Sequence, residues 1–469
     1  MRRAALPTIF LLLAAGIMTA FPAAARGVGV LPEIRWDVRE EKLPNGLKVL
    51  LLKDSRAPVA TFMVWYRVGA RNELPGATGL AHLLEHMMFK GTRRFSGKVF
   101  SNLVQRNGGR HNAFTSRDYT AYFERIAADR VGVAVELEAD RMKNLLLDPK
   151  EFLLERSVVQ EERRRSVDDN PVSLLWEDLR AAAYRAHPYG WPVIGWETDI
   201  RRLRVEEARR FYETYYVPNN ATVVAVGDFD PDDMLAAIRK RFGPIPRGPA
   251  PPEVTSREPE QRGERRIQVK RPAKLPYFAA AYHVPTYARE DAYALDVLGE
   301  ILGGGRSARL ERVLRRERQL VLSIGAGYPG TSIDPDLFTV SAQPAPGVKV
   351  EDVEAAVWGE VERLKREAPS EAELARVKRR LAAEYVIGLD SQFYRAMSLG
   401  RSEISGGWRR LTTYLPKIAA VTAEDVRRVA RKYLVESNRT VGILIPLPMD
   451  AKPSRRRPAG KPPGGGHIQ

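Results

Sequence analysis

The spacing of apolar positions divides the first half of the chain into strands and helices. Residues 46–54 and 58–69 are rich in Val, Leu and aromatic side chains, which predicts two strands that lie side by side. Apolar and polar residues alternate along residues 111–125 as in a pair of strands, and residues 221–227 are predicted to form one more strand. Helical patterns occupy residues 79–89, 96–107, 129–147, 149–166, 172–185, 205–216 and 231–242. This mixture indicates an α+β domain.

The second half repeats this plan. Strands are expected at residues 266–270, 277–283, 322–328 and 337–343, with helices from residue 290 and from residue 350 to about residue 400. Eight residues recur without a gap 218 positions further on: Glu206, Arg209, Arg210, Tyr215, Val217, Asn220, Thr222 and Val223 return as Glu424, Arg427, Arg428, Tyr433, Val435, Asn438, Thr440 and Val441. Coincidence between two similar helix–strand units is the alternative, and we favour a duplicated pair of domains.

We therefore predict an α+β protein made of two homologous α/β-sandwich domains, each a sheet packed with helices. The first domain is expected at residues 31–243 and the second at residues 266–447. Between them, residues 244–265 are rich in Pro and then charged, which is typical of a semi-rigid, exposed linker. Residues 448–469 combine Pro, Gly and basic side chains and are expected to be a disordered basic tail.

The first 25 residues have the composition of a targeting segment. Arg2 and Arg3 precede an apolar stretch at residues 9–21, and Ala23-Ala24-Ala25 follows it. This order predicts a signal peptide cleaved after about Ala25. A single membrane anchor is the alternative, but the apolar run falls short of the ~20 residues that span a bilayer. We expect an exported, periplasmic protein with no stable membrane insertion.

Composition narrows the chemistry further. The 75 Lys and Arg against 58 Asp and Glu give a formal net charge of +17, spread along helices without interleaved aromatic residues. We interpret this excess as solvated faces, or as steering for acidic partners, and expect no nucleic acid partner. The chain has no Cys, which excludes disulfides, thiolate metal sites and Cys nucleophiles. Any metal must therefore be held by carboxylates and by the six His.

Two of these His stand in one helical turn. His82 and His86 are at i and i+4, so both imidazoles project from one helix face and can share a metal ion. Glu85 lies beside them and can hold a water at that metal. A merely polar helix face is the alternative interpretation, but it would not favour His so strongly.

A catalytic zinc needs a third protein ligand and an open position. Glu155 and Glu162 are seven residues apart on one predicted helix and hence on the same face. Glu162 is therefore the ligand candidate and Glu155 the carboxylate that supports the ligands. Taken alone, this stretch is more typical of an ordinary charged helix.

At this point the sequence resembles the inverted-zincin peptidases, the family of pitrilysin, insulin-degrading enzyme and the mitochondrial processing peptidase. The resemblance covers nearly the whole mature chain. It is carried by the segments 79–92 (GLAHLLEHMMFKGT), 108–116 (GGRHNAFTS), 155–162 (ERSVVQEE) and 187–190 (HPYG), which occur in the family's order.

The resemblance implies a zinc endopeptidase with one Zn²⁺ per chain on His82, His86 and Glu162. Glu85 is then the general base and Glu155 supports His ligation. It also implies that the strand at residues 112–115 is an exposed edge to which a peptide substrate adds as a further β-strand. Asn112, Ala113 and Phe114 are then the substrate-binding residues, with Asn112 gripping the peptide backbone. Without the resemblance, Asn112 could equally be a turn residue after Gly-Gly. His111 and His187 are interpreted as loop residues rather than ligands.

One departure from the family concerns the donors that stabilise the reaction's oxyanion. The family supplies them from an Arg and a Tyr in the C-terminal domain. Here Leu314 and Arg315 match the pattern, but Leu322 stands where the Tyr is expected, and a Leu donates no hydrogen bond. Tyr328, six residues further along, is not placed to replace it without a shift. A homologous partner subunit that supplies an Arg/Tyr pair is therefore expected, with a homodimer as the alternative.

The resulting hypothesis is a zinc-dependent endopeptidase that hydrolyses peptides or unfolded polypeptides in an enclosed chamber. The alternative is a non-catalytic subunit that forms the chamber or binds peptides.

Overall fold

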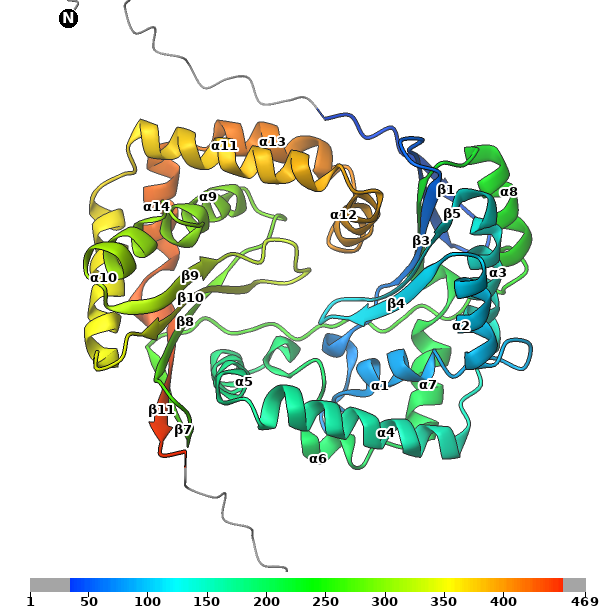
Figure 1. Ribbon diagram of the computed structural model, residues 1–469, viewed down its shortest axis with the longest axis horizontal. Helices are drawn as coiled ribbons and strands as arrows, with labels where there is room; N and C mark the ends of the chain where they lie inside the picture. Colours follow the sequence, from blue (N-terminus) through cyan, green and yellow to red (C-terminus); the bar gives the residue numbers. More distant parts are fainter. Residues whose placement is uncertain (1–33, 450–469) are drawn as a thin grey trace, which may run out of the picture.

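The computed structural model describes residues 34–449 and shows two halves, each built on one sheet (Figure 1). The predicted signal peptide and all but the first two residues of the predicted tail lie outside the described residues. The first sheet has six strands in the order β1-β2-β6-β3-β5-β4. Their bounds are β1 Arg39–Lys42, β2 Lys48–Lys53, β3 Val59–Tyr66, β4 Arg110–Thr115, β5 Thr120–Ala127 and β6 Ala221–Gly227.

Eight α-helices belong to the first half of the described chain: α1 Leu80–Met87, α2 Gly97–Arg106, α3 Val131–Asn144, α4 Pro149–Arg163, α5 Pro171–Ala183, α6 Glu197–Ile200, α7 Val205–Tyr215 and α8 Pro231–Phe242. Apolar side chains of α1, α3, α7 and α8 pack on one face of the first sheet and form its main core. Each of these helices buries one apolar stripe, which is why its sequence has helical periodicity.

The second sheet has five strands in the order β7-β11-β8-β10-β9. Their bounds are β7 Arg265–Pro272, β8 Tyr277–Val284, β9 Val321–Gly327, β10 Asp336–Pro344 and β11 Arg439–Leu447. Its helices are α9 Asp291–Gly303, α10 Val350–Arg366, α11 Glu371–Gly388, α12 Gln392–Ile404, α13 Arg410–Ala420 and α14 Ala423–Tyr433. Helices α9, α10, α11, α13 and α14 contribute to the core on one face of this sheet.

The topology confirms the predicted duplication. Strand β6 is parallel to β2 and antiparallel to β3, and β11 is likewise parallel to β7 and antiparallel to β8. Helices α7 and α14 begin and end at positions that differ by the repeat offset. The repeated Asn220 and Asn438 each donate from Nδ2 to the carbonyl of the Tyr five residues earlier, at 2.9 and 2.8 Å. The two domains are therefore homologous in detail.

One expectation about neighbouring strands is wrong. Strands β2 and β3 follow each other in the sequence and were expected to lie side by side, but β6 lies between them. β6 is buried along its whole length, as suits a central strand with a continuous apolar run.

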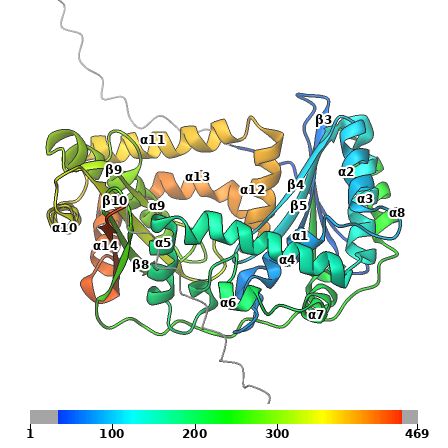
Figure 2. The same cartoon turned by 60° about the horizontal axis from the view of Figure 1, so that its bottom comes forward.

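Each half covers the second face of the other half's sheet with one helix. Helix α12 packs with Ala396, Leu399 and Ile404 on the first sheet, where Trp65 of β3 is fully buried. Helix α5 packs with Leu175 and other apolar residues on the second sheet. Figure 1 shows α12 between the two halves, and Figure 2 shows α4 and α5 running along one side of the molecule. The two halves therefore share their cores.

Residues 243–264 form no helix or strand, yet they are anchored to both halves. Glu258 accepts hydrogen bonds from the backbone N–H groups of Arg185, Ala186 and His187 at 2.8 to 3.0 Å. Gln261 is buried and donates to the carbonyl of Arg439 at 2.7 Å. The connection is thus held in place along its length.

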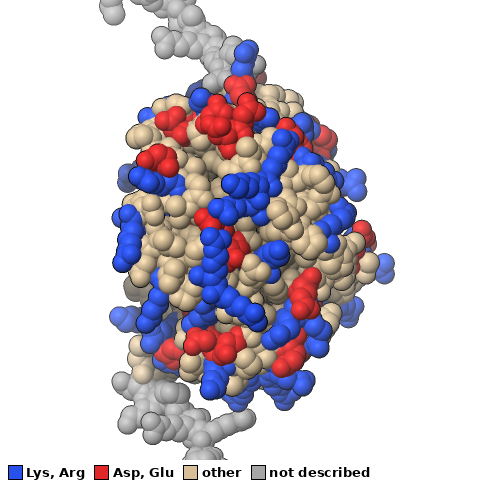
Figure 3. Space-filling view, turned by 90° about the vertical axis from the view of Figure 1, so that its right-hand side faces the viewer, with Lys and Arg blue, Asp and Glu red and all other residues tan. Residues whose placement is uncertain are grey.

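Basic and acidic side chains alternate on the side of the first half that Figure 3 shows. Ion pairs between side chains of the first half include Arg94 with Glu136 and Arg39 with Asp232. Pairing of this kind fits the interpretation of the basic excess as solvated faces. Within residues 34–449, none of the helices has the length and apolar character needed to cross a membrane.

Candidate functional site

Helix α1 carries the candidate ligands and is fixed at its first turn. Gly79 precedes the helix with φ +87°, a conformation that L side chains rarely adopt, and a Cβ there would lie 2.5 Å from the carbonyl oxygen of Ile194. The carboxylate of Glu73 accepts from the N–H groups of Gly79 (2.9 Å) and Ala81 (2.8 Å). These N–H groups have no partner within the helix, so Glu73 acts as its cap. The orientation of His82 and His86 is thereby set.

The structure brings His82, His86 and Glu162 together. Nε2 of His86 lies 3.4 Å from Oε2 of Glu162, and Nε2 of His82 lies 3.8 Å from Oε1 of the same carboxylate. One donor atom from each of the three residues lies within 4.8 Å of the other two. Ligand atoms on a tetrahedral zinc with bonds of about 2.0–2.2 Å stand roughly 3.3–3.6 Å apart. The donor set and its spacing therefore fit a zinc ion.

Glu155 lies directly behind this cluster. Its Oε1 is 2.9 Å from Nδ1 of His86, and its other oxygen pairs with Lys90. A carboxylate on the second nitrogen of a His fixes the tautomer and turns the first nitrogen toward the metal. Lys90 was not singled out from the sequence, although it lies in the same segment as the two His. Among the described residues, Nδ1 of His82 has no such partner.

The charges of the cluster favour a cation among these side chains. Burial lowers the pKa of His82 to about 4, so this imidazole is neutral. Burial also disfavours the charged form of His86, but hydrogen bonds to Glu155 and Glu162 outweigh it and raise the pKa of His86 to about 9. The hydrogen bond from His86 in turn lowers the pKa of Glu155 to about 2 and lowers the pKa of Glu162. A metal ion therefore competes with the proton for the imidazole of His86.

Glu85 faces the same region and is held by Thr115. Oγ1 of Thr115 donates to Oε2 of Glu85 at 2.5 Å. Burial raises the pKa of Glu85, and the Thr115 hydrogen bond partly offsets this. A carboxylate with a raised pKa is a better proton acceptor. Sequence reasoning placed Thr115 in the substrate-binding strand but did not predict its contact with Glu85, because its side-chain direction depends on the register of β4 with β5.

Thr115 ends β4, the strand predicted to bind substrate. β4 pairs with β5 only and forms an edge of the first sheet. The Asn112 side chain is exposed, with its Oδ1 2.9 Å from the N–H of Ala113. Ala113 packs against the main core and Phe114 against Trp65, at 5.4 Å between ring centroids. At this edge the backbone groups of alternate residues of β4, Ala113 among them, face away from β5, and the Asn112 side chain is exposed beside them.

The remaining candidates lie away from the cluster. Arg315 belongs to the π-helical turn η6 (Glu311–Glu317) and pairs with Glu311 at 2.6 Å. Leu322 is 45% exposed on β9, the edge strand of the second sheet. In the described residues, no ion pair or hydrogen bond joins Arg315 to His82, Glu85, His86 or Glu162.

Neither of the two other histidines near these motifs joins the cluster. His111 was interpreted as a loop residue, but it lies within β4, where its ring sits between Phe89 (5.6 Å) and Phe100 (5.3 Å). The β4 pairing places it in the sheet. His187 caps the short turn η4 (Pro188–Gly190), and its Nε2 lies 3.1 Å from Asp334 of the second half. The His187–Gly190 segment thus joins the two halves.

Two family models match the chain. The model described as Insulinase (Peptidase family M16) covers residues 48–196, and the model described as Peptidase M16 inactive domain covers residues 202–381. The chain is 33% identical to the zinc protease PqqE of Helicobacter pylori over 86% of this chain and 92% of that protein. It is 27% identical to a probable mitochondrial-processing peptidase subunit beta of Arabidopsis thaliana, over 88% of this chain and 79% of that one.

A solved structure agrees with these matches. The crystal structure of a protease from Helicobacter pylori superimposes with a TM-score of 0.85 at 32% identity, covering 87% of this chain and 99% of that one. Relatives named as zinc proteases support a peptidase-like function for the chain. The two homologous domains, the matching models and the extent of these alignments lead to one conclusion: the chain belongs to the M16 family of peptidases.

Proposed function

We propose that this chain is a zinc-dependent endopeptidase that hydrolyses peptides or unfolded polypeptides in an enclosed chamber formed with its second half and a partner. The observation that carries the proposal is the convergence of His82, His86 and Glu162 beside Glu85 and next to a free sheet edge. The targeting pattern of residues 1–25 supports export to the periplasm.

Each residue of the site then has a defined task. His82, His86 and Glu162 hold the metal, and Glu155 keeps His86 oriented. A zinc ion bound there would polarise the scissile carbonyl and lower the pKa of water. Glu85 takes the proton from the attacking water, and Thr115 keeps the Glu85 carboxylate turned toward that water.

Substrate binds in this proposal as an added strand. The outer edge of β4 offers backbone N–H and C=O groups, and Asn112 offers its side-chain amide. A polypeptide must be extended to pair with a sheet edge, so peptides and unfolded chains are preferred to folded proteins. The adjacent position of Thr115 brings such a strand close to Glu85.

The position of Leu322 supports the need for a partner. A Leu on β9 cannot donate to an oxyanion, and Arg315 is engaged with Glu311. We infer that a homologous chain supplies the Arg/Tyr pair, with a homodimer as the alternative. The presence of Leu322 also favours the second candidate function, a non-catalytic subunit that forms the chamber or binds peptides.

The test compares two neighbouring carboxylates. Glu162 faces the two His, whereas Glu161 pairs with Arg164 (2.7 Å) and Arg165 (2.6 Å) on the outside of α4. Glu162→Gln should weaken zinc binding more than about 100-fold. Loss of a residue that only hydrogen-bonds a metal ligand already lowers metal affinity ~10–100-fold, and loss of a ligand itself should lower it further. Glu161→Gln should leave it unchanged. Zinc affinity is measured by competition with a chromophoric chelator.

A third variant separates metal binding from catalysis. Glu85→Gln should keep its zinc and lose peptide hydrolysis, measured with and without a copurified partner chain. Equal zinc affinity in the Glu161 and Glu162 variants would show that the ligand is misassigned. Substantial hydrolysis by zinc-loaded Glu85→Gln would remove Glu85 from the mechanism, and no hydrolysis by the wild-type chain with its partner would favour the non-catalytic subunit.

A further inference from the structure

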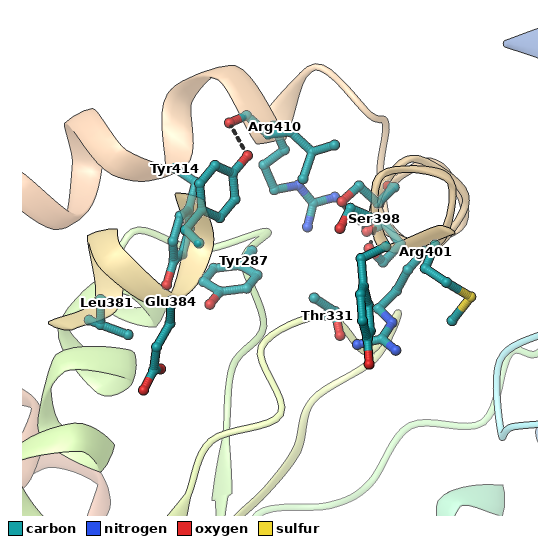
Figure 4. Close-up of a pocket in the computed structure, with 14 residues that line it drawn as sticks. Tyr287, Thr331, Leu381, Glu384, Ser398, Arg401, Arg410 and Tyr414 are labelled. Carbon is teal, nitrogen blue, oxygen red and sulfur yellow. Dashed lines mark hydrogen bonds between the residues drawn. The ribbon is translucent and has the colours of Figure 1, made fainter. Parts of the chain in front are cut away.

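A pocket of about 360 Å³ lies in the second half between α11, α12 and α13 (Figure 4). Its inner wall is aromatic. The rings of Tyr385 and Tyr414 stack with centroids 5.3 Å apart, and Tyr287 meets Tyr414 edge-on at 5.9 Å. The hydroxyls of Tyr287 and Tyr414 both donate to Asp296 at 2.6 Å, which fixes the two rings. The pocket is therefore preformed, and its volume is in the range of ligand sites.

Two guanidinium groups enter this pocket. Arg410 at the start of α13 donates through Nη2 to the carbonyl of Ser405 (2.6 Å), but its Nη1 is buried without a partner. The guanidinium of Arg401 on α12 makes no hydrogen bond or ion pair with any residue in the described range. Figure 4 shows Arg410 directed toward Ser398 and Arg401 directed toward Thr331.

The positive charge of this pocket is not balanced from within. Among the described residues that line it, Glu384 alone is acidic, and its carboxylate accepts from Arg380 of the same helix at 2.7 Å. A buried guanidinium N–H without an acceptor is unfavourable, and a carboxylate is the group that pairs best with it. The chemistry of the pocket therefore selects an anion attached to an apolar body.

The mouth of the pocket is close to the elements that hold β4. Tyr394 at the rim is 60% exposed, and its neighbour Phe393 contacts Phe123 of β5 with ring centroids 4.9 Å apart. On the other side, Thr331 belongs to the β9–β10 loop, where the N–H of Ile333 donates to Asp118 of the β4–β5 turn at 3.1 Å. Chain neighbours of the residues on both borders of the pocket thus contact the β4–β5 hairpin.

We propose that this pocket binds a carboxylate of a peptide, with the apolar part of the same residue against the tyrosines. This inference rests on the proposed function, because a peptide reaches the mouth of the pocket by binding to β4. The carboxylate can be the C-terminus of the peptide or an acidic side chain. Arg401 and the free Nη1 of Arg410 are its two donors, and the pocket gives the site a preference for one end or one residue of the substrate.

The test measures binding without turnover, in the full-length Glu85→Gln chain. Three short peptides, each with an N-terminal BODIPY label that carries no net charge, share one sequence that ends in Leu: one has a free C-terminal carboxylate, one a C-terminal amide, and one the amide with a Glu before the Leu. Fluorescence anisotropy gives each Kd. We expect at least one carboxylate peptide to bind about tenfold more tightly than the neutral amide. Tight binding of the first peptide identifies a terminal carboxylate, and tight binding of the third identifies an acidic side chain.

Two matched substitutions locate this discrimination. Arg401 is exposed, so Arg401→Gln removes a donor without disturbing the core, and it should abolish the tenfold difference. Arg379→Gln removes the same charge from an exposed position of α11 outside the pocket and should preserve the difference. Equal Kd values for all three peptides, or equal losses in both variants, would overturn the proposal. Because hydrolysis is not measured, these outcomes are independent of whether the zinc site is catalytic.

Discussion

The contact between α12 and the first sheet depends on the absence of one side chain. Gly400 lies inside α12, and a Cβ built there would stand 2.0 Å from Cε2 of Trp65 and 2.2 Å from its Nε1. Carbon atoms in contact are normally about 3.5–4.0 Å apart. Trp65 is fully buried and cannot turn away, so Gly400→Ala must displace α12 from the sheet.

The size of the effect follows from two opposing contributions. Gly→Ala inside a helix stabilises by about 1 kcal/mol. Overpacking a buried site costs about 1–3 kcal/mol, and the short distances place Gly400 at the upper end. Gly400→Ala should therefore destabilise the protein by about 2 kcal/mol. Because the two halves share their cores and unfold together, this corresponds to a fall of roughly 2 °C in Tm.

Gly359 provides the matched control. It lies inside α10 with no atom within 4 Å of its Cβ position, so Gly359→Ala should raise Tm. Thermal unfolding is followed by circular dichroism. Trp65→Phe in the Gly400→Ala background should recover part of the loss, because the smaller ring leaves room for the methyl group. An increase in Tm for Gly400→Ala similar to that of Gly359→Ala would refute the packing of α12 on Trp65.

Three further predictions concern the proposed active site. Glu155→Gln should weaken zinc binding by about 10–100-fold in the chelator competition, because Nδ1 of His86 loses its carboxylate partner, and an unchanged affinity would contradict this role. Thr115→Val should lower kcat for a peptide about tenfold while the zinc content stays constant, since the hydroxyl that is lost bonds Glu85 and, at 3.4 Å, Thr120, but none of the ligands; an unchanged kcat would mean that Thr115 does not position Glu85. Leu322→Tyr should raise the activity of the isolated chain by up to ~100-fold if a missing oxyanion donor limits it, whereas full activity of the unmodified homodimer would exclude an obligatory partner.

Much of the fold could be predicted because the relevant signals are local. The strand at residues 221–227 has the predicted bounds, and the recurrence of Asn220 as Asn438 reflects the same side-chain hydrogen bond in both domains. The i, i+4 spacing of His82 and His86 similarly fixes their relation within one helix. Patterns of this kind need no knowledge of distant parts of the chain.

The incorrect or missing expectations depend on contacts between distant segments. Periodicity identified β2 and β3 as strands but does not state which strands pair, so the insertion of β6 was not foreseen. The sequence predicted that the helical stretch ends at about Gly400, whereas in the structure Gly400 lies inside α12 and closely approaches Trp65. The role of Thr115 required the position of β4 relative to α1.

Because each half covers the sheet of the other with one helix, the two halves depend on each other for folding. Without α12, residues 34–243 would expose Met63, Trp65 and Val224 to water, and without α5 the second half would expose Leu444 in the same way. Neither half is therefore a self-sufficient folding unit, but the surfaces that hold them together do not depend on the peptide bonds of residues 244–265. A chain nicked there would keep its two fragments associated, and the same architecture could be encoded as two separate polypeptides that assemble after synthesis.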